Sequence, residues 1–403
     1  SVLRSKHMIM PLDHIRVIDL SRVLAGPFCT MMLGDMGAEI IKIENPDGGD
    51  DTRGWPPFYE GGESSYFQSV NRNKKSLTLD LKSDEGKKIL ADLIKQSDVL
   101  IQNFRPGAIE RLGFGWEICK EINPRLIYSS VSGYGQNGPY RERPAYDILL
   151  QGEGGLMSIT GPSDGSGYKT GIAIADLTTA LFTIQGILLS IISREKTGQG
   201  QEIDVSIQDG QAALMSHAAG NFFATSIPPG RLGNEHPSIA PYRDFRCSDG
   251  ELIVAAANDS LWQRFAKAIG REDLANDNSW AKNADRVKGR KILDAEIEKT
   301  MIEKSRSERG KIISEAGVPC GPIRNIQELT EDPQIKHRDM IVEIEHAKTG
   351  ILKMMGIPVK LSETPGKILL PPPLLGEHTD EILTEIAKLT KSDIDSLREA
   401  KII

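Results

Sequence analysis

The chain of 403 residues is too long for one small hydrophobic core and long enough for two or three domains. It is 39% hydrophobic and 26% charged, as in ordinary soluble globular proteins, and its net charge of −7 comes without a long basic run, which argues against a general nucleic-acid binder. The four cysteines are far apart and the histidines form no HExxH or HxxxH pair. We therefore predict neither a disulfide framework nor a metal site.

No apolar run that is free of polar residues approaches the length of a membrane span, so we expect no membrane partner. The first ten residues, SVLRSKHMIM, lack the apolar core of a signal peptide. We expect a cytoplasmic location, or the mitochondrial matrix if these residues remain from a processed transit peptide. They are equally compatible with an expression remnant.

The first third of the chain alternates between predicted strands and helices. IRVIDL (15–20) and EIIKIE (39–44) are predicted strands, and the helix between them begins near Pro27 and ends near Gly37. Further strands are predicted in SLTLDL, DVLIQNF and LIYSSVSGYG, and further helices in SDEGKKILADLIKQS and GAIERLGFGWEICKEI (107–122). This alternation over residues 15–135 predicts an open α/β sheet with parallel strands.

The stretch TGIAIADLTTALFTIQGILLSII (170–192) contains one charged residue, Asp176. Its apolar residues recur at helical spacing, which predicts a helix over 177–194 with Asp176 as the N-cap. A carboxylate in such a segment costs several kcal/mol or more unless it is compensated. Asp176 is therefore either a simple cap or a carboxylate kept for chemistry, because a helix N-terminus stabilises negative charge and a partly desolvated carboxylate can act as a nucleophile.

The composition changes after Phe223. The Pro- and Gly-rich stretch SIPPGRLGNEHPSIAPYRDF predicts a linker, and YRDFRCSDGELIVAAA predicts a hairpin that is followed by charged helices. MIVEIEH and LKMMGIPVKL are further predicted strands, and a helix is expected after PPPLLGEHTDEIL. We predict a large domain that begins with residues 1–224, a smaller domain over 225–330, and a return to the large domain over 331–403.

Several common nucleotide and hydrolase motifs are missing. The loop after the first predicted strand, SRVLAGP, has one glycine and no GxGxxG pattern, which counts against a dinucleotide fold of the usual kind. GxxxxGK[ST] is also absent, which counts against P-loop enzymes. No GxSxG elbow stands between a predicted strand and a predicted helix, which counts against α/β-hydrolases.

Nine blocks of the sequence, in order, resemble the class III coenzyme A transferases, the family that includes formyl-CoA transferase, carnitine CoA-transferase and α-methylacyl-CoA racemase. They include IRVIDLSRVLAGPFCTMMLGDMGAEIIKIENPDGGDDTR, NRNKKSLTLDLK, NFRPGAIERLGF, GYGQNGPY, GIAIADLTTAL, REKTGQGQEIDVSIQD and GVPCGPI. Among the subgroups, the chain looks most similar to succinyl-CoA:glutarate CoA-transferases. The blocks span nearly the whole chain.

The resemblance implies a large doubly wound, Rossmann-like α/β domain built from both chain ends, a smaller α+β domain, and an interlocked, ring-like homodimer. It also implies that Asp176 is the nucleophile that moves CoA from an acyl-CoA, such as succinyl-CoA, to a carboxylic acid through anhydride and thioester intermediates. Coenzyme A is then a substrate, and no tightly bound cofactor is expected. An α-methylacyl-CoA racemase and a non-catalytic CoA-binding protein are the alternatives.

The family motifs imply a set of CoA contacts, whose members are Val23, Ala25, Leu79, Lys82, Asn103, Arg105, Ala108, Arg111, Leu112 and Tyr134. Without the resemblance, the charged members are ordinary surface residues, the leucines ordinary core, and the tyrosine a turn residue. Asn45 replaces an Arg of formyl-CoA transferase, so we do not expect that charge contact to CoA. Leu24 replaces a Gln, and the glycine-rich loop of the small domain has no counterpart, so we expect a different acceptor pocket. Arg22, Arg231 and His236 are candidates for holding a distal carboxylate.

Overall fold

The computed structural model describes residues 9–403, so the expectation for the first ten residues falls almost wholly outside it. The described chain forms two compact units. The first, which we call the sheet unit, comprises residues 9–156, 169–220 and 336–403. The second, the inserted unit, comprises 157–168 and 221–335.

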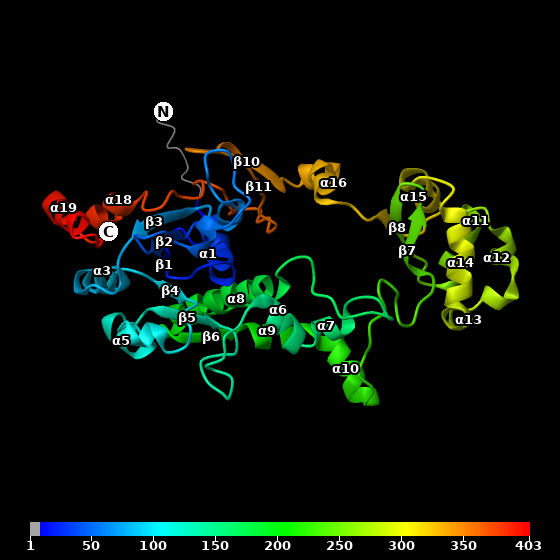
Figure 1. The fold of residues 1–403 in the computed structure, drawn as a ribbon, viewed down its shortest axis with the longest axis horizontal. Helices are drawn as coiled ribbons and strands as arrows, with labels where there is room; N and C mark the ends of the chain where they lie inside the picture. Colours follow the sequence, from blue (N-terminus) through cyan, green and yellow to red (C-terminus); the bar gives the residue numbers. More distant parts are fainter. Residues whose placement is uncertain (1–8) are drawn as a thin grey trace. The chain divides into compact units, whose positions relative to one another are not determined.

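The sheet unit is built on six parallel strands in the order β3-β2-β1-β4-β5-β6 (Figure 1). Their bounds are β1 (Arg16–Asp19), β2 (Glu39–Glu44), β3 (Lys74–Thr78), β4 (Val99–Gln102), β5 (Ile127–Ser132) and β6 (Glu202–Ser206). This is the strand order of the doubly wound dinucleotide-binding fold, reached here without the glycine motif of that fold in the loop after β1. The predicted fold class is confirmed.

Helices cover both faces of this sheet, because successive side chains of a strand point to opposite faces. Val17 and Ile40 pack with α1 (Ala25–Asp35) and α8 (Ile174–Thr197) in one hydrophobic cluster. Ile18 and Ile41 belong to a second cluster, with α3 (Asp84–Lys95), α5 (Trp116–Ile122), α18 (Thr379–Glu385) and α19 (Lys391–Glu399). Continuous apolar strands such as EIIKIE follow from this two-sided burial.

The last part of the chain completes the sheet unit. The Thr78 amide donates to Thr379 Oγ1 at 3.1 Å, and the Asp80 amide donates to the Ile402 carbonyl at 2.7 Å. Leu383 is fully buried in the same cluster as the sheet. Before these helices lies a hairpin of β10 (Ile341–His346) and β11 (Gly350–Met355).

One predicted helix of the sheet unit is wrong. Residues 107–122 form two helices, α4 (Ala108–Arg111) and α5, because Gly113 adopts a φ of 93° and interrupts the chain between them. The remaining helices up to residue 225 are η1 (Asp51–Gly54), α2 (Ser65–Val70), α6 (Asp147–Glu153), α7 (Leu156–Ile159), α9 (Ile207–Leu214) and α10 (Ser216–Thr225).

Helix α8 is the one helix within residues 9–403 that is long and apolar enough to cross a membrane by length and composition alone. Core helices of other proteins meet the same criteria. The inner face of α8, with Ala180 and Ile187, packs against the sheet and α1. Its outer side leaves several apolar side chains exposed, namely Leu181, Leu188, Leu189 and Ile192.

The inserted unit is an α+β domain with its own core, as expected. Its antiparallel sheet has the order β7-β8-β9, with β7 (Tyr242–Cys247), β8 (Gly250–Ala255) and β9 (Cys320–Pro322). Buried Trp262, Phe265 and Phe245 lie at the centre of the core. The helices are α11 (Asp259–Ala268), α12 (Glu272–Asn276), η2 (Asn278–Trp280), α13 (Asn283–Lys288), α14 (Arg290–Met301), α15 (Arg306–Glu315) and α16 (Ile326–Glu331); α17 (Pro333–His337) leads back to the sheet unit.

Candidate active site

The strand order places a crevice beside the carboxyl ends of β1 and β4. The chain leaves β1 toward β2 on one side and later returns to β4 on the other, so the loops after these two strands diverge. Ligands of doubly wound sheets bind at such a switch point. Here the flanking segments are residues 21–24, which lead from β1 into α1, and Asn103, which follows β4.

A cavity of about 690 Å³ opens at this position, and its lining brings together three carboxylates and four guanidinium groups. The carboxylates are Asp51, Asp147 and Asp176. The guanidinium groups belong to Arg22, Arg105, Arg141 and Arg143. Within residues 9–403, no group of three or more His, Cys, Asp or Glu is placed to hold a metal ion.

A second cavity, of about 340 Å³, adjoins the first, because Arg22, Asp51 and Phe104 line both. Its apolar walls include Leu79 and Leu112, and Lys82 is also part of its lining. The two cavities together form a path along the carboxyl edge of the sheet.

Asp176 lies in the first turn of α8 but is not its N-cap, which corrects the sequence prediction. The helix begins three residues earlier than predicted and Ala173 occupies the cap position. The capping acceptor comes from α6, where Asp147 Oδ1 accepts the amides of Ala175 at 2.8 Å and Asp176 at 3.1 Å. Because Asp147 takes over the capping, no described residue donates a hydrogen bond to the Asp176 carboxylate, which is free for chemistry.

Desolvation in this half-buried position raises the pKa of Asp176 to about 7, and the neighbouring negative charge of Asp147 adds to the rise. Burial also raises the pKa of the Tyr66 phenol to about 12, with contributions from the charges of Asp176, Asp147 and Asp50. Asp176 is thus a carboxylate that ionises near neutral pH, and the Tyr66 phenol, which is influenced by its charge, stays protonated.

The four arginines differ in how far they are committed to partners. Arg143 pairs with Glu153 at 2.7 Å and lies over the rings of Tyr134 and Tyr140. Arg141 pairs with Glu142, and Arg22 makes a long contact of 3.4 Å with Asp51. The exposed Arg105 guanidinium has no ion pair within residues 9–403. The cavity can therefore offer positive charge to an anionic ligand.

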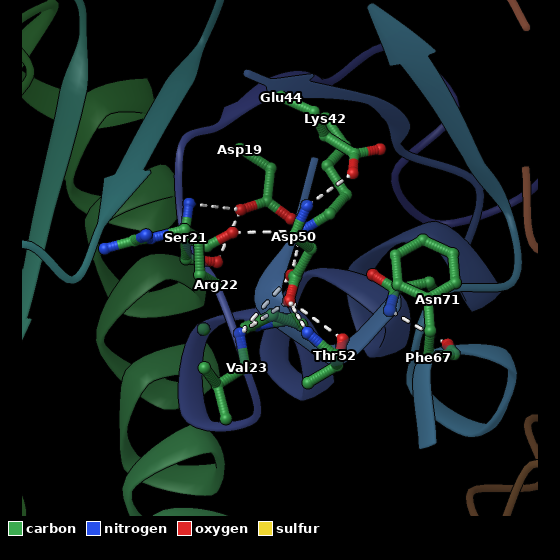
Figure 2. Close-up of polar contacts among 12 residues, drawn as sticks. Asp19, Ser21, Arg22, Val23, Lys42, Glu44, Asp50, Thr52, Phe67 and Asn71 are labelled. Carbon is green, nitrogen blue, oxygen red and sulfur yellow. Dashed lines mark hydrogen bonds and ion pairs between the residues drawn. The ribbon is translucent and has the colours of Figure 1, made fainter. Parts of the chain in front are cut away.

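A buried network of charges lies beside the loop that connects β1 to α1 (Figure 2). Lys42 Nζ lies 2.9 Å from Asp50 Oδ2, and both side chains are at most 1% exposed. Burial alone would raise the pKa of Asp50, but the Lys42 ammonium holds it at about 2. Lys74 lies 3.3 Å from Asp19, and its burial lowers its pKa to about 8.

The network holds residues 21–23 in an unusual conformation. Val23 has a φ of 71°, which for a β-branched residue costs about 1–3 kcal/mol and persists only where the surroundings impose it. Asp50 accepts the Val23 amide with both oxygens at 3.3 Å. Asn103 accepts the Arg22 amide at 2.9 Å and donates to the Arg22 carbonyl at 2.8 Å.

Comparison with known proteins decides the family. A family model described as CoA-transferase family III matches residues 12–379. The chain belongs to CoA-transferase family III. A human succinyl-CoA:glutarate CoA-transferase is 39% identical, with 98% of this chain and 90% of that protein covered. A succinate–glutarate CoA-transferase from Agrobacterium fabrum is 38% identical, with 95% and 97% covered.

Other relatives and solved structures agree with this family. An acetyl-CoA:oxalate CoA-transferase from Acetobacter aceti is 41% identical, with 87% of this chain and 89% of that protein covered. A crystal structure of a CaiB/BaiF family protein from Brucella suis is 37% identical and superimposes with a TM-score of 0.88, covering 94% of this chain and 99% of the other. This CoA-transferase therefore has both the fold and the enzyme class that the sequence predicted.

The CoA contacts that the family resemblance predicted fall into three groups in this CoA-transferase. Val23, Ala25, Asn103 and Arg105 line the larger cavity, and Leu79, Lys82 and Leu112 line the smaller one. Ala108, Arg111 and Tyr134 line neither; Tyr134 donates instead to Glu153 at 2.7 Å. The Asn103 side chain is engaged with the Arg22 backbone, so its role is to hold the loop.

Two candidates for binding a distal carboxylate lie in the inserted unit and hold their own loops. Arg231 donates to the carbonyls of Pro162 and Gly165, and His236 Nδ1 accepts the Ser238 amide. Arg22 lines both cavities, so it stays a candidate for this role.

Sequence reasoning overlooked the residues that support the CoA-transferase site. Lys42 and Asp50 were not singled out, although a lysine inside the otherwise apolar strand EIIKIE is itself a signal, because a buried ammonium needs a partner. Arg141 and Arg143 were also missed. Arg141 and Arg143 reach the larger cavity through tertiary contacts, which the spacing of residues in the sequence does not predict.

Proposed function

We propose that this CoA-transferase moves CoA between two dicarboxylic acids, with succinyl-CoA as a donor, through covalent intermediates on Asp176. The observation that carries this proposal is the Asp176 carboxylate, half-buried in the larger cavity with its pKa near neutrality and its capping role taken by Asp147. A carboxylate that is poorly solvated and free of hydrogen-bond donors is a strong nucleophile. The names of the similar enzymes support dicarboxylate substrates.

The proposed reaction has four balanced steps. The ionised Asp176 attacks the thioester carbonyl, which forms a mixed anhydride and releases CoA thiolate. The thiolate attacks the aspartyl carbonyl, which forms an aspartyl-CoA thioester and releases the donor acid. The acceptor carboxylate then attacks this thioester, which forms a second anhydride and releases CoA thiolate again. This thiolate attacks the acceptor's acyl carbonyl of the anhydride, which gives the new acyl-CoA and free Asp176.

The remaining parts of the site support this scheme. The smaller cavity, with Lys82 in its lining, has the apolar walls and the positive charge that a nucleotide needs, and the path between the cavities leads toward Asp176. CoA bound along this path need not leave between steps, so its binding energy holds each intermediate in position. Arg22, Arg105, Arg141 and Arg143 supply charge for the distal carboxylate of a dicarboxylate.

Trapping the intermediate tests the proposal. The enzyme is incubated with succinyl-CoA alone and then with hydroxylamine, and the peptide that contains Asp176 is examined by mass spectrometry. We expect a hydroxamate at Asp176, and no adduct in the Asp176→Asn variant. Transfer activity in the wild type without any adduct, or normal turnover by the variant, contradicts the covalent scheme.

A second measurement separates transfer from racemisation. A racemase needs a second acid/base group that titrates near neutral pH. The position before Asp147 is Tyr146, a phenol that is a poor base at neutral pH. We expect no α-deuteration of 2-methylacyl-CoA in deuterated water and transfer of CoA when a carboxylate acceptor is added. Rapid deuteration without transfer would favour the racemase.

A further inference from the structure

The loop between β1 and α1 is held by side chains at each backbone polar group of residues 21–22 and at the amide of residue 23. Asp19 accepts the Ser21 amide at 2.9 Å, and Lys42 donates to the Ser21 carbonyl at 3.0 Å. Asn103 binds both polar groups of Arg22, and Asp50 accepts the Val23 amide. These four side chains come from β1, from β2, from the segment after β2 and from the segment after β4.

The part of the network nearest the loop is the ion pair of Lys42 with Asp50. Figure 2 shows Asp50 between the Lys42 ammonium and the Val23 backbone. Thr52 fixes the other side of Asp50 by donating its amide at 3.0 Å and its hydroxyl at 2.8 Å to Oδ1. These bonds fix the orientation of the Asp50 carboxylate, and the carboxylate in turn fixes the position of the Val23 amide.

The held loop lies where the two cavities meet. Arg22 lines both cavities, and Val23, Leu24 and Ala25 line the one that contains Asp176. The left-handed conformation of Val23 fixes the direction of the chain between them. A non-glycine residue in this region is retained where its surroundings impose it, and such strain concentrates at functional sites.

We propose that the buried Lys42–Asp50 pair is a positioning device for catalysis: it imposes the strained conformation of Val23 and so fixes the wall along which the acyl-CoA thioester approaches Asp176. Lys42 and Asp50 line the smaller cavity but not the one that holds Asp176, so their effect on Asp176 passes through the loop. This inference rests on the proposed acyl-CoA chemistry of that cavity.

A double-mutant cycle tests the mechanism of positioning. Asp50→Asn keeps the size of the side chain but removes the charge that Lys42 and the Val23 amide share. We expect kcat/KM for transfer from succinyl-CoA to fall about tenfold or more, mainly through kcat. Glycine adopts a φ of 71° without strain, so in a Val23→Gly background the same substitution should cost less than about threefold.

A matched control separates positioning from stability. Asp35→Asn breaks another ion pair of the sheet unit, Asp35 with Arg72 at 2.8 Å, whose side chains are both 3% exposed. Neither residue lines a cavity at the site. We expect this variant to lose thermal stability while kcat/KM stays within about twofold of the wild type, measured well below its melting temperature.

Several outcomes overturn the inference. An Asp50→Asn effect of equal size in the wild-type and Val23→Gly backgrounds shows that the pair does not act through the conformation of Val23. An equal loss of kcat/KM in Asp35→Asn shows that it acts only through stability. If Asp50→Asn does not fold, Thr52→Val, which removes one donor to Asp50, must show a smaller defect with the same dependence on residue 23. A wild-type enzyme without transfer activity instead contradicts the proposed function.

Discussion

Asp147 caps helix α8, and Asp176 is left available as the proposed nucleophile. One carboxylate could not serve in both roles at once. Asp147 accepts the helix amides and Asp176 is left with a raised pKa and no donor among the described residues. A carboxylate that accepted those amides itself would be stabilised as an anion and would be a weaker nucleophile. The same arrangement makes the activity of the enzyme sensitive to pH.

The rate of acyl-enzyme formation should rise with pH and level off above a midpoint near 7, because only the ionised Asp176 attacks. Asp147→Asn keeps an oxygen acceptor for the helix amides but removes the neighbouring negative charge. The midpoint should therefore move down, though not to the ordinary value, because the desolvation remains. Single-turnover reactions with succinyl-CoA at different pH values measure both midpoints.

The control for this experiment is Asp209→Asn, which removes an exposed carboxylate from α9 of the same unit. Its midpoint should equal that of the wild type. An Asp147→Asn profile that superimposes on the wild type would show that Asp147 has no electrostatic influence on Asp176.

Asp176→Asn should be inactive but more stable than the wild type at neutral pH. The pKa of Asp176 is higher in the folded than in the unfolded chain, so its ionisation costs stability, and this cost grows between about pH 4 and pH 7. With allowance for partial exposure, we expect a gain of about 1–3 kcal/mol at pH 8 and almost none at pH 4. Thermal unfolding at the two pH values measures it; a gain that does not depend on pH would contradict this origin.

At the scale of the element, the N-terminus of α8 shows why a cap can be mistaken in a sequence. Asp176 is the one carboxylate directly before the apolar run, so N-cap preferences predict it as the cap. The acceptor instead comes from Asp147, 28 residues earlier along the chain than the Ala175 amide that it accepts. The start of the helix and the position of the nucleophile are thus set by tertiary contact with α6.

Asp147→Ala should destabilise the sheet unit by about 0.5–2 kcal/mol, the usual cost of losing a cap, because it leaves the amides of Ala175 and Asp176 without an acceptor. Asp147→Asn should cost less than half as much. Urea unfolding followed by circular dichroism measures both. If the alanine and asparagine variants are equally stable, the capping has no energetic importance.

Those elements that are specified locally could be predicted from the sequence. EIIKIE matches β2 residue for residue, since strand propensity, length and two-sided burial agree there. The prediction of a single helix over 107–122 was wrong, because the break between α4 and α5 depends on the backbone conformation of Gly113. The Lys42–Asp50 pair could not be predicted, because it depends on how the segment after β2 folds back toward the β1–α1 loop.

On the scale of the whole molecule, the outer side of α8 points to assembly. Leu181, Leu188 and Ile192 recur at helical spacing and are 54%, 37% and 51% exposed. Contiguous apolar surface of this kind marks an interface. The homodimer implied by the family resemblance stays a prediction, and this stripe is where it can be tested.

Leu188→Glu combined with Ile192→Glu should raise the dissociation constant of the homodimer by at least about tenfold, because each substitution buries a charge in an apolar contact. Sedimentation velocity over a range of concentrations measures it. Ile292→Glu, which adds a charge at an exposed isoleucine of α14, is the matched control and should leave association unchanged. A wild type that sediments as a monomer, or equal effects of both changes, would contradict the assignment.

The closure of the sheet unit by α18 and α19 has a consequence for biosynthesis. Thr78 and Thr379 are 301 residues apart, so a nascent chain on the ribosome has already made every strand of the main sheet long before these partners emerge. During that time one face of the sheet lacks the cover of Ile382, Leu383 and Ile394. Apolar surface exposed for so long is prone to aggregation. Chaperones that act during translation should therefore bind this chain most strongly between the synthesis of β6 and that of α18.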